Sequence, residues 1–136
     1  MILDSSLVTL RDGTYRQAID LSPGRELLSL RDTRAATTAV SSRTVENRKD
    51  AIRLILSSGD TFCGSPDQRV GLFRNRNLVF VPLARVEIGS RLRGERAGIA
   101  LTVEVIGKAT SDSECRLVRL ETRGEKPFVA EGVLCR

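Results

Sequence analysis

Residues 56–70 read Leu-Ser-Ser-Gly-Asp-Thr-Phe-Cys-Gly-Ser-Pro-Asp-Gln-Arg-Val, a stretch with two turn signals close together. The first, Ser58-Gly59-Asp60, follows the apolar run Ala51–Leu56, and glycine accepts the positive φ that a tight turn between strands requires. The second, Ser65-Pro66-Asp67-Gln68, is by itself typical of a tight turn in which serine and aspartate bond nearby backbone amides. The stretch predicts short strands joined by tight turns.

The rest of the chain repeats this alternation of short runs and turns, and no long stretch carries a helical stripe of apolar residues. We therefore predict an all-β chain of hairpins. Further turn signals are Asp12-Gly13, Ser22-Pro23-Gly24, Ile88-Gly89-Ser90 and Arg123-Gly124-Glu125. The expected strands, besides 51–56, are Leu7–Leu10, Thr14–Ala18, Glu26–Leu30, Ala36–Val45, Leu78–Pro82, Ala100–Ile106 and Arg116–Thr122.

The two halves of the chain match each other, in a degenerate but ordered way, at an offset of about 65 residues. A duplication predicts two similar β-subdomains that pack about a pseudo-twofold axis and bury each other's apolar faces. Chance similarity between hairpins is the alternative. We expect one domain over residues 1–136, with halves of approximately 1–75 and 76–136. The matches are Leu21–Leu27 with Val86–Leu92, Thr38–Val40 with Leu101–Val103, Arg53–Ile55 with Arg116–Val118, Gly59 with Gly124, and Phe62 with Phe128.

Composition indicates one aliphatic core. The chain has 136 residues, 40% of them hydrophobic and only 4% aromatic, so the interior must consist mainly of valine, leucine and isoleucine. The first residues lack the basic and apolar segments of a signal peptide, and no apolar run is long enough for a membrane helix. We expect a cytoplasmic monomer without a membrane association.

The basic residues are dispersed along the chain. Lysine and arginine exceed the acidic residues by a net charge of +5, which favours solubility more than nucleic-acid binding. The densest patch, Arg43–Arg53, has no aromatic residues interleaved for base stacking, so a solvated strand face is the simpler interpretation. A small basic β-domain that binds nucleic acid stays open as an alternative.

Histidine is absent, which excludes every Ser-His or Cys-His dyad and the commonest zinc ligand. The three cysteines, Cys63, Cys115 and Cys135, match no zinc or redox spacing and form an odd set. We interpret them as reduced thiols and expect neither a metal nor another cofactor.

Three blocks of the sequence resemble one family in order and spacing. Ser6–Thr14 with Ile19–Gly24 resembles the opening block of Hint (hedgehog/intein) domains, residues 56–70 the second block, and Phe128–Arg136 the final block. The resemblance covers nearly the whole chain and is closest to mini-inteins or bacterial intein-like domains without a homing endonuclease. It implies a horseshoe of hairpins that cuts or splices the polypeptide in which it is embedded.

The resemblance also implies where the chemistry would lie. Family members carry a nucleophilic residue at the position of Met1, a Thr-x-x-His pair at Ser65 and Gln68, and a terminal His-Asn of which only Arg136 has a counterpart. Arg119 lies nearest the auxiliary catalytic position of the family. The candidate site residues are therefore Met1, Ser65, Asp67, Gln68, Arg119, Cys135 and Arg136.

Most of the chemical groups of that site are missing. The thioether of Met1 has no ionisable proton, Gln68 cannot shuttle a proton, and Arg136 is a fixed cation. We expect self-processing to be absent or strongly altered in the chain as given. Met1 and the missing asparagine lie at the ends, where trimming could account for them. Gln68 and Arg119 are internal and indicate either degeneration or a divergent mechanism in which Ser65 and Asp67 act more.

Two classes of function follow. In the first, the domain is autocatalytic rather than a turnover enzyme, and its partners are its own flanking segments. In the second, it is a non-catalytic descendant of the fold, kept as a structural or binding module of a larger assembly such as a phage particle.

Overall fold

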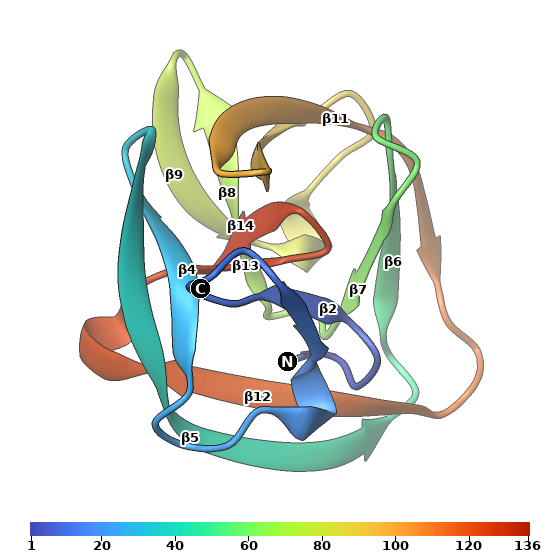
Figure 1. Ribbon diagram of the computed structural model, residues 1–136. Coiled ribbons are helices and arrows are strands. Elements are labelled where there is room, and N and C mark those ends of the chain that lie inside the picture. The colour runs from blue at the N-terminus through green and yellow to red at the C-terminus, as the bar shows by residue number, and fades with distance from the viewer.

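The computed structural model describes all of residues 1–136 and is built from strands, which confirms the all-β prediction (Figure 1). Its only helices are three single 3-10 turns, η1 (Ala18–Asp20), η2 (Leu83–Arg85) and η3 (Arg123–Glu125). None of the helices has the length and apolar character needed to cross a bilayer. The strands are β1 (Ile2–Leu3), β2 (Leu7–Thr9), β3 (Tyr15–Gln17), β4 (Glu26–Arg31), β5 (Arg34–Arg48), β6 (Ile52–Leu56), β7 (Thr61–Gly64), β8 (Arg69–Arg74), β9 (Asn77–Pro82), β10 (Arg91–Arg96), β11 (Ile99–Thr110), β12 (Cys115–Thr122), β13 (Phe128–Ala130) and β14 (Val133–Cys135).

The strands pair antiparallel in one continuous path that runs from β3 to β4. The order is β3-β2-β13-β14-β8-β10-β11-β6-β7-β1-β12-β5-β4, with β9 attached to β8. In Figure 1 these strands curl around a central space, and both ends of the chain lie inside the curl. All five predicted turn glycines have a positive φ, as tight turns require.

Hydrogen bonds recur between the two halves of the chain. Gly24 N–H donates to the Val40 carbonyl at 2.7 Å, and Gly89 N–H donates to the Val105 carbonyl at 2.7 Å. Positions 24 and 89, like 40 and 105, are 65 residues apart, so the two subdomains are duplicates. The sequence match of Thr38–Val40 with Leu101–Val103 was therefore wrong by two residues. A slip of two keeps the inward and outward alternation of a strand, so the pattern of apolar residues could not detect it.

A long cation secures the same 3-10 turn in each half. The Arg43 guanidinium donates to the carbonyls of Ile19 and Leu21 beside η1. The Lys108 ammonium donates to the carbonyls of Ala84 at 3.2 Å and Val86 at 2.8 Å beside η2. These carbonyls have no strand partner there, so the cations satisfy them. Arg43, one of the residues in the basic patch, thus serves the fold.

The two subdomains exchange strands. β5 pairs with β12, where Val40 lies opposite Thr122, and β11 pairs with β6, where Val105 lies opposite Leu56. Each half completes its sheet with a strand of the other half. Since Val40 and Val105 are equivalent, Leu56 corresponds to Thr122, and the sequence match of 53–55 with 116–118 was displaced. The connections that precede β6 and β12 differ in length, which a fixed spacing cannot follow.

Some strands escaped prediction because their sequences are polar. β10 reads Arg-Leu-Arg-Gly-Glu-Arg, yet it is a central strand between β8 and β11. Glu95 is buried, and its Oε1 accepts the Gly98 N–H at 2.6 Å. A side chain at Gly94 would meet Leu101 Cδ1 at 2.8 Å. Tertiary contacts, rather than an apolar alternation, place this strand inside the sheet.

Candidate functional site

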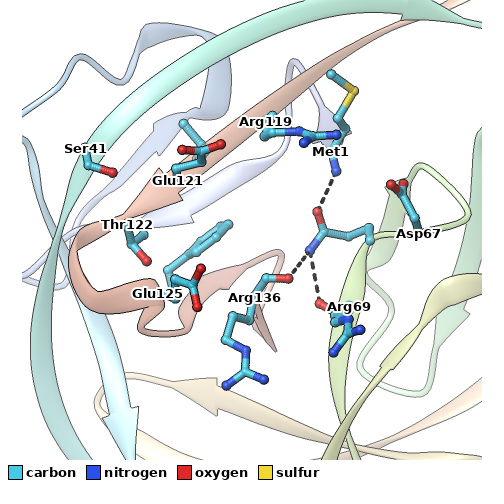
Figure 2. A pocket seen from close by; sticks show the side chains of 12 residues that line it. Met1, Ser41, Asp67, Arg69, Arg119, Glu121, Thr122, Glu125 and Arg136 are labelled. Carbon is cyan, nitrogen blue, oxygen red and sulfur yellow. Dashed lines mark hydrogen bonds between the residues drawn. The ribbon is translucent and has the colours of Figure 1, made fainter.

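A cavity of about 550 Å³ opens inside the curl of strands, between β12 on one side and the start of β8 on the other (Figure 2). Both ends of the chain contribute to its wall. It holds five of the predicted site residues, Met1, Asp67, Gln68, Arg119 and Arg136, and it is also lined by Ser41, Arg69, Leu120, Glu121, Thr122, Glu125 and Phe128.

The backbone of residue 1 is held from three sides. Its amino group donates to Ser65 Oγ at 3.1 Å and to Gln68 Oε1 at 2.8 Å, and its carbonyl accepts the Ser65 N–H at 2.9 Å. β1 continues between β7 and β12, with Ile2 opposite both Gly64 and Val118. A Cβ at Gly64 would lie 2.6 Å from the Met1 carbonyl oxygen, so only glycine permits this approach.

The last residue reaches the same cavity along β14. Arg136 N–H donates to the Arg69 carbonyl at 3.0 Å, directly after the Cys135–Val70 pair of β14 and β8. Its guanidinium stacks over the Phe80 ring, 4.4 Å from the ring centroid. The Arg136 carbonyl accepts Gln68 Nε2 at 3.2 Å. The carbonyl thus faces Gln68, while the side chain is anchored on an aromatic ring.

Two further predicted residues set the charge around residue 1. A hydrogen bond from Ser65 lowers the pKa of Asp67, and the nearby amino group of residue 1 lowers it further. Figure 2 shows Arg119 beside Met1 and Asp67 across from it. The Asp67 carboxylate and the Arg119 guanidinium therefore both act on the amino group of residue 1.

Comparison with known proteins identifies the fold. No family model matches the chain, and no curated protein matches its sequence. The DnaB intein from Synechocystis sp. PCC 6803 superposes with a TM-score of 0.86 over 99% of this chain and 96% of that chain, at 16% identity. The chain has the Hint fold of inteins. The PabCDC21-1 intein gives a TM-score of 0.87 at 12% identity over 99% and 96% of the two chains.

A bacterial intein-like domain from Clostridium thermocellum has the same Hint fold, with a TM-score of 0.80 at 14% identity, over 99% of this chain and 96% of that domain. The horseshoe of hairpins implied by the sequence blocks is thereby confirmed. Identities of 12% to 16% show the fold alone, so the roles of the residues in the cavity must be argued from their contacts.

Cys135 lies outside the cavity, in the hydrophobic core of the Hint fold. It is 0% exposed, and its Sγ donates to the Phe128 carbonyl at 3.6 Å. Burial raises the pKa of its thiol far above the ordinary range. Because the thiolate is the nucleophilic form, Cys135 packs the core and does not supply a nucleophile. Cys63 is also buried, and burial raises the pKa of its thiol.

Sequence reasoning missed several residues that shape the site. Gly64 carried no signal, because the close approach of residue 1 depends on a strand pair 62 residues apart in sequence. Glu121 had a usable signal, because it lies two residues from Arg119 on β12 and alternate residues share a strand face. Arg69 enters through its carbonyl, which no sequence pattern reports.

The amino group of residue 1 predicts a pH-dependent stability for the chain beginning at Met1. Burial lowers the pKa of this group from 8.0 to about 6, and Asp67 partly opposes the shift. Between these values the unfolded chain binds more protons than the folded chain, so the free energy of unfolding should fall by about 2–3 kcal/mol from pH 8.5 to pH 5.5. Urea unfolding at both pH values measures it. The chain has no histidine, so no ordinary side chain titrates in this window.

The control is the same chain with an acetylated N-terminus, which has no amine to titrate and should be nearly flat across this pH range. Equal pH dependence in both forms would assign the effect to other groups.

Proposed function

We propose that this domain processes the polypeptide in which it is embedded, acting on the peptide bonds before residue 1 and after residue 136. One observation supports this most directly: backbone atoms of both residues bond to a single side chain, Gln68, inside one cavity. A cavity that gathers both boundaries is suited to a reaction on the flanking segments. The Hint fold shared with inteins fits the same activity.

The contacts of residue 1 fit an intramolecular acyl transfer. A side-chain thiol or hydroxyl at position 1 would attack the carbonyl carbon of the preceding residue, forming an ester or thioester as the C–N bond breaks. The proton of the nucleophile passes to the nitrogen of residue 1, which becomes an amine held by Ser65 and Gln68. Positioning of this kind supplies high effective molarity. Met1 has only a thioether, so the chain as given stops before this step.

Restoration of a nucleophile tests the proposal. We would place the domain between two marker segments, with Met1→Cys and an asparagine after Arg136, and follow the products by intact mass spectrometry. Added thiol should release the upstream marker from the cysteine precursor, because the thioester is open to thiol exchange. The matched Met1→Ala precursor should stay intact under the same conditions. Full persistence of the cysteine precursor would contradict the proposal.

A non-catalytic structural module is the second candidate, and the chemistry of Gln68 favours it. Gln68 Oε1 accepts a hydrogen bond from the nitrogen of residue 1, and an amide cannot give that nitrogen a proton at neutral pH. No cluster of three or more cysteine or carboxylate side chains is placed to hold a metal that would assist. An intact cysteine precursor would favour this function, and the search would turn to binding partners.

A further inference from the structure

Every polar atom of the Gln68 side chain is used, and its partners lie at opposite ends of the chain. Oε1 accepts the nitrogen of Met1 at 2.8 Å, while Nε2 donates to the carbonyls of Arg136 at 3.2 Å and Arg69 at 3.0 Å. Gln68 is only 7% exposed, so water does not compete freely for these bonds. Figure 2 shows the three hydrogen bonds converging between Met1, Arg69 and Arg136.

The partners fix which way the amide points. A backbone nitrogen can only donate and backbone carbonyls can only accept, so a flipped amide would set donor against donor and acceptor against acceptor. The bridge does not depend on where the chain ends. With a segment attached on either side, residue 1 keeps one N–H and residue 136 keeps its carbonyl oxygen.

The carbonyl of Arg69 ties the bridge to the sheet. It accepts both Gln68 Nε2 and the N–H of Arg136, the latter at 3.0 Å. Residue 136 is therefore held twice, once through its own N–H on Arg69 and once through its carbonyl on Gln68. Loss of the second bond alone would leave the strand in place and release only the boundary carbonyl.

We infer that Gln68 is a positioning residue that couples the two boundary peptide groups, so that the place of the residue 136 carbonyl depends on the bond Gln68 makes at residue 1. This inference rests on the proposed function, because it concerns the two bonds that function would act on. Hydrogen bonds through one amide polarise each other, which carries the coupling. Glutamate offers the acceptor without the donors, and methionine offers neither.

The test uses the restored precursor, which carries Met1→Cys, an asparagine after Arg136 and two markers. Two rates are measured separately, the thiol-induced release of the upstream marker and the release of the downstream marker. The variants are Gln68→Glu and Gln68→Met. The matched control is Gln17→Met, a change of the only other glutamine, which is exposed on β3.

Gln68→Glu should lower downstream release about tenfold and change upstream release by less than about threefold, because only the donor half of the bridge is lost. Gln68→Met should lower both rates about tenfold, and Gln17→Met should change neither. An equal fall of both rates in Gln68→Glu, or an unchanged downstream rate, would overturn the coupling.

A second measurement needs no processing. Carboxypeptidase B removes a C-terminal arginine, and in the given chain the bond from Gln68 holds that residue. Removal of Arg136 should be about tenfold faster in both Gln68 variants than in the parent or Gln17→Met, as followed by mass spectrometry. An unchanged rate would overturn the bridge. If protection depends on Gln68 while the restored precursor stays intact, the bridge stands and the proposed function fails.

Discussion

Gly64→Ala is expected to dislodge residue 1 from its site and to lower processing of the restored precursor about 100-fold, because misplacement of a reacting group by about 1 Å costs that much. The added Cβ would lie 2.6 Å from the Met1 carbonyl oxygen, and a backbone atom cannot swing away as a flexible side chain does. Overpacking of this kind should also lower the free energy of unfolding by about 1–3 kcal/mol. Upstream release with thiol and urea unfolding measure the two effects.

Gly107→Ala is the matched control for this change. A Cβ there would meet the Ile55 side chain, with Cδ1 at 3.0 Å, and that side chain can rotate aside. Gly107 lies on β11, away from the cavity. We expect wild-type processing and a loss below about 1 kcal/mol. Normal upstream release from Gly64→Ala would show that residue 1 does not need the position seen here.

Phe62→Ala is expected to lower the free energy of unfolding by about 3–5 kcal/mol, the usual effect of removing a buried phenylalanine. Phe62 is 0% exposed in the main core and pairs with Leu54 across β6 and β7. Small domains are stable by only about 5–15 kcal/mol, so much of the stability would be lost. The midpoint and slope of urea unfolding give the change.

Tyr15→Ala is the control, because Tyr15 is the only tyrosine and is 53% exposed on β3. It should change stability by no more than about 0.5 kcal/mol. Similar losses in both variants would mean that Phe62 is not packed as the structure has it.

The candidate site was predictable in part. The blocks around Met1, Ser65 and Gln68 indicated which residues would meet, and their contacts place these three together. Cys135 was included because it neighbours Arg136, but on a strand the side chains of neighbours point to opposite faces. Cys135 therefore enters the core while the carbonyl of Arg136 faces the cavity.

By itself, the sequence determined the all-β class, the turns with positive-φ glycines and the existence of a duplication, because these follow from alternation and local backbone preference over a few residues. Only the tertiary structure decided the exchange of β6 and β12 between subdomains, the polar central strand β10 and the bridge of Gln68 to both boundaries. These features depend on contacts between residues distant in sequence, where register and burial, rather than local pattern, set which atoms meet.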